Sequence, residues 1–143
     1  MQINEFHWED LLGVYDIIRQ EENGNWSLDQ LEHSLKLENV VCYVARFKED
    51  ILGFVLIETT AFDFDILEVG VDVRYRKKGI ASKLMEKVVD YAQMHHKEKA
   101  TLEVACDNIP AIALYEKFGF VKIHERKNYY KNGKNALIYQ RIF

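Results

Sequence analysis

The chain has 143 residues, of which 48% are hydrophobic and 13% aromatic, and these values suit a single domain spanning residues 1–143. The formal net charge of -4 argues against a general nucleic-acid binder, which normally presents a net basic surface. The N-terminus lacks the basic and then apolar pattern of a secretory signal, and no apolar run approaches the roughly 20 residues that span a bilayer. We therefore expect a cytoplasmic protein with no membrane segment.

The cysteines and histidines give no sign of a metal site. Cys42 and Cys106 lie in apolar, strand-like stretches without CxxC spacing, which is typical of buried free thiols. His95 and His96 are adjacent, so they point to different sides of a helix, and the remaining histidines show no ligand spacing with them. We expect no bound metal.

The first half of the chain predicts strands around two helices. Apolar residues recur at helical spacing after Trp8, and this helix is expected to fray in residues 21–25. Ser27 followed by Gln30 fits a capping box that begins a second helix. Segments rich in β-branched and aromatic residues predict strands at residues 2–6, 40–47, 51–60 and 64–73.

The second half predicts a βαβ unit followed by a helix and a hairpin. A helix over residues 80–96 separates the strand at 64–73 from one at 100–105, so a right-handed crossover makes the two strands parallel. A further helix over 110–118 ends at Gly119, and strands at 120–130 and 136–143 flank a tight Asn132-Gly133 turn. The predicted architecture is an α/β fold of order β-α-α-β-β-β-α-β-α-β-β, a mixed sheet with helices packed on it.

A basic loop joins the strand at 64–73 to the helix that follows. It carries Arg76, Lys77 and Lys78, and Gly79 then opens the helix, so basic side chains and free N–H groups at a helix N-terminus together favour a phosphate. The patterns for a nucleoside triphosphate and for a dinucleotide are both absent. The spacing present is Arg76-x-x-Gly79-x-Ala81, in which Gly79 and Ala81 allow a ligand to approach the backbone closely.

This spacing resembles the signature [Q/R]-x-x-G-x-[G/A] of the GNAT superfamily of N-acetyltransferases, which binds the pyrophosphate of acetyl-CoA. The segment LEVACDNIPAIALYEKFGF, residues 102–120, is similar to a second signature of the superfamily. The segments NWSLDQL and ERKNYYKNGKNALIY look like the RimI type, the ribosomal-protein alanine N-acetyltransferases. The resemblance implies the single-domain GNAT fold and acetyl-CoA as cosubstrate.

The resemblance also implies roles for individual residues. The backbone of the strand end would hold the pantetheine arm, with the Val71 N–H polarising the thioester carbonyl, and the basic loop would hold the pyrophosphate. The implied cofactor-binding residues are Val69, Gly70, Val71, Arg76, Lys77, Lys78, Gly79, Ile80, Ala81, Ser82 and Asn108. The implied catalytic residues are Glu103 as general base and Tyr115 as the acid for the leaving thiolate.

Structural roles are alternatives for the same residues. Glu103 lies between Leu102 and Val104 in an expected interior strand, where an unpaired carboxylate is costly, so it serves either catalysis or a structural ion pair. Tyr115 is alternatively a core aromatic residue and Asn108 a helix cap.

Three functions fit these features. The leading hypothesis is acetyl transfer from acetyl-CoA to the N-terminal α-amine of a protein, such as a ribosomal protein, by direct attack in a ternary complex. The second is acetylation of a small amine, such as a polyamine or an aminoglycoside, and the third is a CoA-binding sensor without turnover. Acidic residues suit a cationic acceptor of either kind; they are Glu58, Asp63, Asp65 and Glu68. We expect a monomer or a homodimer with no nucleic-acid partner.

Overall fold

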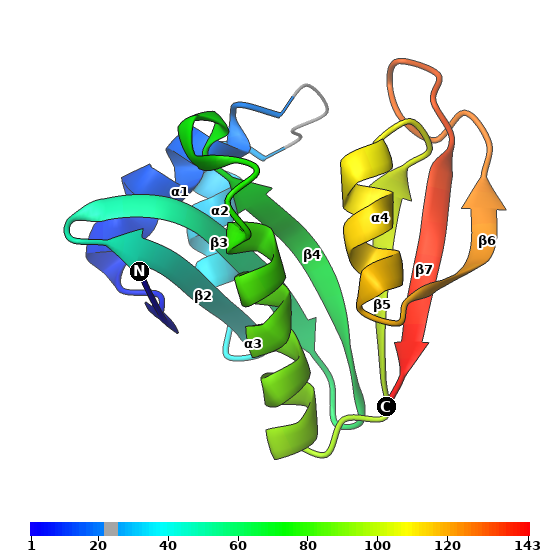
Figure 1. The fold of residues 1–143 in the computed structure, drawn as a ribbon, viewed down its shortest axis with the longest axis horizontal. Coiled ribbons are helices and arrows are strands. Elements are labelled where there is room, and N and C mark those ends of the chain that lie inside the picture. Colours follow the sequence, from blue (N-terminus) through cyan, green and yellow to red (C-terminus); the bar gives the residue numbers. More distant parts are fainter. Residues whose placement is uncertain (22–25) are drawn as a thin grey trace.

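Strand-forming segments build one mixed sheet that runs through the chain. The computed structural model describes residues 1–21 and 26–143, and within them seven strands pair in the order β1-β2-β3-β4-β5-β7-β6 (Figure 1). The strands are β1 (Gln2–Glu5), β2 (Val40–Phe47), β3 (Asp50–Thr59), β4 (Asp63–Val71), β5 (Lys99–Ala105), β6 (Val121–Arg126) and β7 (Ala136–Ile142). The predicted order of elements and the α/β class are confirmed.

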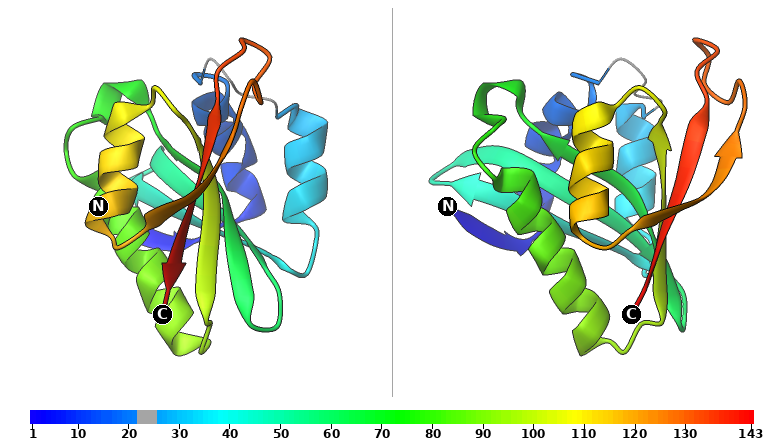
Figure 2. Two further views of the ribbon diagram at one scale, coloured as in Figure 1. Left: turned by 90° about the vertical axis from the view of Figure 1, so that its right-hand side faces the viewer. Right: turned by 45° about the vertical axis from the view of Figure 1, so that its right-hand side comes forward.

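Helices cover both faces of the sheet. The short α1 (Leu11–Ile18) and α2 (Leu28–Leu35) lie on one face, and α3 (Ile80–Met94) and α4 (Ile109–Lys117) lie on the other (Figures 1 and 2). The predicted capping box begins α2, since the Ser27 hydroxyl accepts from the Gln30 N–H at 3.1 Å and the Gln30 side chain accepts from the Ser27 N–H at 2.9 Å. The predicted fraying at residues 21–25 falls, apart from Glu21, outside the described residues. No helix in the described part of the chain is long and apolar enough to cross a membrane.

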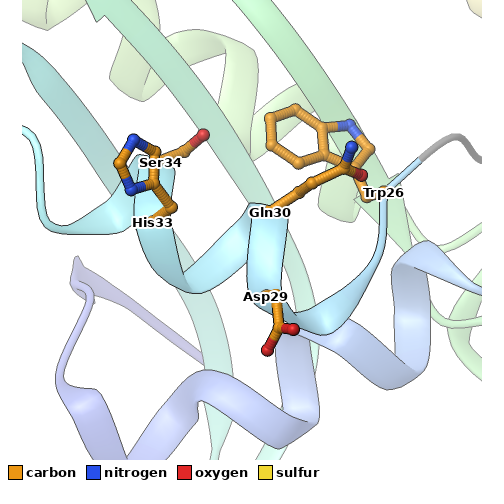
Figure 3. A pocket seen from close by; sticks show the side chains of 5 residues that line it. All are labelled: Trp26, Asp29, Gln30, His33 and Ser34. Carbon is orange, nitrogen blue, oxygen red and sulfur yellow. The ribbon is translucent and has the colours of Figure 1, made fainter.

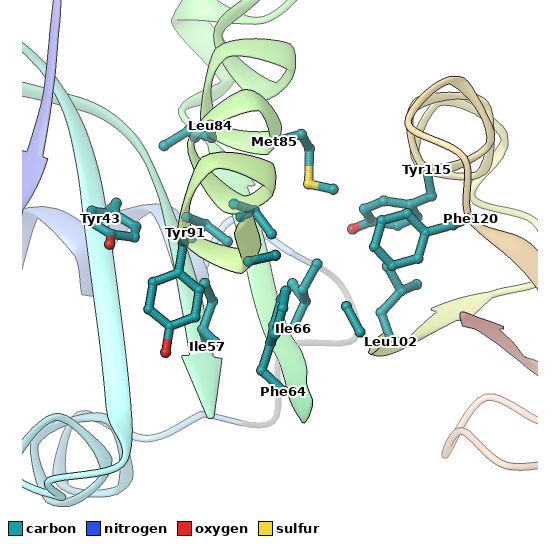
Figure 4. Packing of buried hydrophobic residues seen from close by; sticks show 14 of the residues in the cluster. Tyr43, Ile57, Phe64, Ile66, Leu84, Met85, Tyr91, Leu102, Tyr115 and Phe120 are labelled. Carbon is teal, nitrogen blue, oxygen red and sulfur yellow. The ribbon is translucent and has the colours of Figure 1, made fainter. Parts of the chain in front are cut away.

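Apolar side chains form a core on each side of the sheet. Under α3 and α4 the strands contribute residues such as Phe64, Ile66 and Leu102, which Figure 4 shows beside Leu84 and Met85 of α3. A smaller cluster lies under α1 and α2. These two buried layers hold the strands in fixed positions relative to the helices, because buried apolar area is the main stabilising contribution to a domain of this size.

One buried ion pair fixes the N-terminal end of the fold. Asp10 is 4% exposed, and Arg46 of β2 donates to both of its carboxylate oxygens, at 2.9 and 2.8 Å. Burial alone would raise the pKa of Asp10, but the hydrogen bonds from Arg46 and from the His7 N–H hold that pKa below its usual value. The pair therefore joins the turn before α1 to the sheet.

β4 and β5 are parallel, as predicted, but they stay paired over only half their length. Pairing runs from Asp63 opposite Lys99 to Ile66 opposite Leu102 and then stops. At the same point a bulge shifts the register of β4 against β3 and leaves Leu67 as the extra residue. Beyond it the two strands diverge, and the loops after β4, β5 and β6 lie at that end of the sheet (Figure 1).

Two predicted boundaries are wrong for local reasons. The strand predicted over 64–73 ends at Val71, because the Asp72 side chain accepts from the Arg74 N–H at 2.9 Å and begins a short 3-10 turn, η2 (Val73–Tyr75). The tight hairpin predicted at Asn132-Gly133 is instead the tip of a longer loop, residues 127–135, in which the Gly133 N–H donates to the Tyr130 carbonyl at 2.9 Å. The sheet edge near the site is therefore shorter than the hydrophobic pattern suggests.

Candidate active site

The first turn of α3 presents backbone N–H groups to one end of the opening. Its N-cap, Gly79, has a left-handed φ of 81° and provides no side-chain cap. The first N–H groups of a helix have no acceptor within the helix, and the helix dipole adds partial positive charge there. A Cβ placed on Gly79 would meet nothing within 4 Å, so the space in front of this turn is open. An anion such as a pyrophosphate fits this geometry.

The Arg76 side chain in the same loop already forms hydrogen bonds and an ion pair within the protein. Its Nε donates to the Val71 carbonyl at 3.1 Å and its guanidinium pairs with Glu21 at 3.2 Å. This side chain connects the end of β4 to the segment after α1. The loop therefore offers an anion its backbone N–H groups more directly than the Arg76 charge.

The edge of β4 adds backbone groups to the opening. The Asp72 N–H donates to the Leu52 carbonyl of β3 at 2.9 Å. This hydrogen bond shows which residues at the end of β4 direct their backbone groups toward β3. Because this orientation alternates along an antiparallel pair, the N–H and C=O groups of Val69 and Val71 point the other way, into the gap beside β5. The bond from Arg76 to the Val71 carbonyl agrees with that direction. An extended ligand arm has free backbone partners here.

A pocket of about 520 Å³ connects these features. Its lining includes all of the predicted cofactor-binding residues except Gly70 and Lys78. Gly70 serves the core instead, since a Cβ at this position would lie 2.7 Å from the Phe54 ring and 3.0 Å from Ile17. Sequence reasoning did not single out the other lining residues, which are Glu21, Tyr75, Pro110, Ala111 and Leu114. Tyr75 adjoins the basic loop, and Pro110, Ala111 and Leu114 lie in the segment 102–120 that resembles the second signature, whereas Glu21 comes from outside both segments.

Asn108 has both of the roles considered for it. Its side chain accepts from the Ala111 N–H at 3.3 Å and so caps α4, and the same residue lines the pocket. Pro110 in the first turn suits a helix start, because its missing N–H would have no partner there anyway. The cap keeps the start of α4 against the wall of the pocket.

Tyr115 lies where the pocket meets the core. It is 7% exposed and packs against Phe120 at the end of α4, yet it also lines the pocket (Figure 4). Within residues 1–21 and 26–143 its hydroxyl forms no hydrogen bond. Burial raises the pKa of this phenol above its usual value, and the nearby Glu68, Glu21 and Tyr130 raise it further. The hydroxyl therefore stays protonated and is available as a donor.

Glu103 is not the buried carboxylate that the sequence predicts. Leu102 and Val104 pack under α3 and α4, so Glu103 points to the other face of the sheet, where its side chain is 38% exposed. Arg126 of β6 lies 3.6 Å from it. β5 is an interior strand of the sheet, as predicted, but the Glu103 carboxylate is exposed because α1 and α2 pack against β2, β3 and β4 and leave this part of β5 uncovered.

Glu68 on β4 is a carboxylate next to the pocket-lining Val69. It follows the bulged Leu67 and is only partly exposed. Burial raises its pKa to about 7, and the negative charge of Glu21 contributes in the same direction. Burial also raises the pKa of Tyr130 in the β6–β7 loop to about 12, with Glu103 and Glu68 among the charges that add to it. Glu68 thus raises the pKa of both Tyr115 and Tyr130, together with Glu21 for Tyr115 and Glu103 for Tyr130.

Two other features of the described chain stand apart from this opening. A second hollow of about 520 Å³ lies on α2, where Trp26, Asp29, Gln30, His33 and Ser34 line it (Figure 3). Among residues 1–21 and 26–143, no group of three or more His, Cys, Asp or Glu side chains is placed to hold a metal ion.

Comparison with known proteins identifies the family. The family model described as "Acetyltransferase (GNAT) family" matches residues 2–120 of this chain. The chain belongs to this family. It is therefore an N-acetyltransferase that takes its acetyl group from acetyl-CoA, and the turn at Gly79 and the free edge of β4 fit that donor.

Relatives of this GNAT acetyltransferase act on protein N-termini. A Bacillus subtilis (strain 168) protein, provisionally named a ribosomal protein bS18-alanine N-acetyltransferase, is 32% identical over 133 residues, which cover 91% of this chain and 87% of that protein. The solved ribosomal-protein-S18-alanine N-acetyltransferase of Escherichia coli has the same fold, with a TM-score of 0.91 at 24% identity over 99% of this chain and 92% of that one. Arabidopsis thaliana NAA60 in complex with acetyl-CoA superposes with a TM-score of 0.88 at 20% identity, covering 99% and 98%.

Proposed function

We propose that this acetyltransferase modifies the α-amine at the N-terminus of a protein, such as a ribosomal protein, by direct attack in a ternary complex. The Bacillus subtilis relative, whose name specifies a ribosomal acceptor, aligns with nine tenths of this chain. The structural observation that carries the proposal is the divergence of β4 and β5 beyond Ile66 and Leu102. The donor pocket approaches this gap from the side of α3 and α4, and Glu103 stands on the opposite face.

In this proposal acetyl-CoA is bound mainly by backbone N–H and C=O groups. The first turn of α3 binds the pyrophosphate, Val69 and Val71 pair with the pantetheine arm, and the Val71 N–H polarises the thioester carbonyl. Asn108 holds the start of α4 against the same ligand. Backbone donors are fixed before the substrate arrives, so the reaction needs little reorganisation of the site.

Tyr115 stabilises the leaving thiolate. A phenol whose pKa is raised by burial is a weak acid, so it donates a hydrogen bond to a thiolate of pKa about 8.5 without fully transferring its proton. Its free hydroxyl beside the pocket supports this role. Glu103, on the acceptor side, remains the general base that the family resemblance predicts, although Arg126 compensates its charge.

The acceptor side is acidic. Glu58 lies opposite Asp65 in the pairing of β3 with β4, and burial and then the charges of Glu58, Asp63 and Glu103 raise the pKa of Asp65. A cationic segment behind the acceptor amine would find complementary charge there. We propose that residues 1–143 work as one unit, as a monomer or a homodimer, in the cytoplasm, where protein N-termini emerge.

The test is acetyl-CoA turnover against a panel of amines. The panel contains peptides with different N-terminal residues, including one that begins with alanine, beside polyamines and aminoglycosides. A kcat/KM for the alanine peptide at least tenfold above that for any small amine supports the proposal. Preference for a small amine would replace it with the small-molecule alternative, and CoA binding without product on any amine would replace it with the sensor alternative.

A further inference from the structure

The Asn135 side chain ties together the base of the β6–β7 loop. Its oxygen accepts from the Asn128 N–H at 3.0 Å, and its Nδ2 donates to the Glu125 carboxylate at 2.8 Å. The Asn135 carbonyl also accepts from the Cys106 N–H at 3.0 Å. One partly buried residue therefore joins the end of β6, the start of the loop and the chain that follows β5.

The bond to Asn128 supports an unusual piece of backbone. Asn128 has a left-handed φ of 52°, a conformation in which residues other than glycine are uncommon. The chain then continues directly into Tyr129 and Tyr130, whose rings pack edge to face with 5.2 Å between their centres. By fixing this turn, Asn135 also fixes the direction in which the two tyrosines leave β6.

Pairing of the strands places this loop at the end of the sheet where β4 and β5 separate. β7 begins with Ala136 opposite Ala105, beyond Leu102, the last residue of β5 that pairs with β4. Within the loop, Lys134 forms an ion pair with Asp107. Asp107 precedes Asn108, which lines the donor pocket, so the loop is fastened beside the donor site.

Arg126 connects the loop to the face of the sheet on which Glu103 lies. Its guanidinium is 3.6 Å from the Glu103 carboxylate and 5.5 Å from the centre of the Tyr129 ring. Tyr129 is 47% exposed, so its ring is open to a ligand. The donor pocket approaches the gap from the side of α3 and α4, and an acceptor that enters from the Glu103 face therefore passes this loop.

We propose that Asn135 is a positioning residue for the acceptor: by bonding Glu125 and the Asn128 N–H, it holds the β6–β7 loop in the conformation that binds the chain behind the reacting amine. The proposal rests on the protein N-terminus argued above as acceptor. Asn135 is not among the residues that line the donor pocket, and it acts through the loop rather than on the reacting atoms.

The two bonds require a side chain with one acceptor and one donor at position 135. The ionised Glu125 carboxylate offers only acceptors, and Lys122 donates to its other oxygen at 2.9 Å. Asn135→Asp keeps the acceptor for the Asn128 N–H but turns a second carboxylate toward Glu125, and the like charges repel. Adding Glu125→Gln restores a donor between the two side chains, with the direction of the hydrogen bond reversed.

The experiment compares Asn135→Asp, Glu125→Gln and the double variant with wild type. Asn39→Asp is the matched control, because it makes the same change of charge at an exposed residue before β2, at the opposite end of the sheet from the loop. Initial rates with the alanine peptide at saturating acetyl-CoA give kcat and KM. Calorimetry gives CoA affinity, and hydrogen exchange followed by mass spectrometry reports on residues 127–135.

The expected loss in Asn135→Asp lies in acceptor binding. The KM for the peptide rises about tenfold, the effect of losing one hydrogen bond to a charged group. The kcat stays within about twofold of wild type, because the loop contacts the acceptor equally in the ground and transition states. Loop amides exchange about tenfold faster, since the loop opens more often. CoA affinity does not change.

Rescue by the second substitution separates the hydrogen bond from a general effect on the fold. The double variant should return the peptide KM and the exchange rate to within about threefold of wild type, as coupled partners do in a double-mutant cycle. Glu125→Gln alone should remain close to wild type, because the new amide oxygen accepts from Asn135 and the exposed Lys122 turns away. Asn39→Asp should match wild type.

Four results would overturn the proposal. They are an unchanged peptide KM in Asn135→Asp, a loss that the double variant does not restore, an equal loss in Asn39→Asp, and a parallel fall in CoA affinity. The last would mean that the substitution disturbs the whole fold and not the loop.

The acceptor and the role of Asn135 fail separately in this design. If wild type prefers a small amine to the peptide, the proposed acceptor is wrong, and the KM values for that amine in the same variants decide the role of Asn135. The pattern of loss and rescue then supports that role, and unchanged values overturn it. If the peptide is a good substrate with the same KM in every variant, the role of Asn135 fails while the proposed function stands.

Discussion

Replacing Glu68 by glutamine should stabilise the protein above neutral pH. The wild-type carboxyl has a pKa of about 7 in the folded chain, raised by burial from a usual value of 4.5. Above pH 7 it is ionised in both folded and unfolded states, and only the folded state bears the cost of holding that charge away from water. Glutamine has nearly the same shape and carries no charge.

The expected size follows from the difference between the two pKa values. About 2.5 pH units correspond to about 3.4 kcal/mol at 1.36 kcal/mol each, and partial exposure of Glu68 reduces this through solvent screening to about 2 kcal/mol. For a chain of this length that gain corresponds to a rise in Tm of about 4–8 °C. The gain should be full above pH 7 and vanish below about pH 4.5, where both states of the wild type are protonated.

Thermal unfolding followed by circular dichroism at pH 8.5 and at pH 4.5 measures the effect, always as the difference between variant and wild type at one pH. Subtracting the wild type removes the pH response of every other group. Equal stabilisation at both pH values would mean that packing rather than ionisation is responsible. No stabilisation at pH 8.5 would show that Glu68 is well hydrated or already paired in solution, and the reasoning about its charge would be refuted.

Three further substitutions test other parts of the structure. Gly79→Trp should abolish CoA binding measured by calorimetry, whereas Gly133→Trp, at a glycine with the same φ of 81° and equally open space, should keep it, because the two share backbone strain and differ only in location. Tyr115→Phe should lower kcat by about tenfold to a hundredfold, the value of about 1.5–3 kcal/mol for a hydrogen bond to a charged group, with CoA affinity unchanged. Arg46→Met should destabilise the fold by about 3 kcal/mol in urea unfolding at pH 7, because it leaves Asp10 charged and buried, and this loss should shrink below about pH 4 as Asp10 becomes protonated.

Local signals predicted most of the fold. The capping box at Ser27, the β-branched and aromatic residues of β3 and the helical spacing of α3 each depend on neighbours within one turn or one strand, and each is confirmed. The element boundaries that were predicted wrongly depend on local hydrogen bonds, which the hydrophobic pattern of the sequence does not reveal. Asp72 ends β4 by binding its own following turn, and Asn132-Gly133 is a common hairpin dipeptide placed inside a loop that extends beyond it.

The misplacement of Glu103 has a different origin. An acidic residue between two apolar ones predicts a carboxylate on the opposite side from the core, and the sequence does not tell whether anything covers that side. Glu103 has no helix over it, whereas Glu68, between Leu67 and Val69, follows a bulge and lies opposite Leu56, which is buried under α1 and α2. Both residues are flanked by apolar residues in the sequence, so only the bulge and the helix packing explain why their burial differs.

The two halves of the active site differ in how much of the chain builds them. The donor half depends largely on consecutive residues, from the free edge of β4 through the turn at Gly79 to the start of α3, and one short spacing therefore identifies it. The acceptor half combines the segment after α1, one residue of β4, one of β5 and the β6–β7 loop, which meet only because β4 and β5 separate after Ile66. The pKa of a carboxylate such as Glu68 is raised only when these segments come together in the fold and bury it. A local sequence pattern therefore does not predict this pKa.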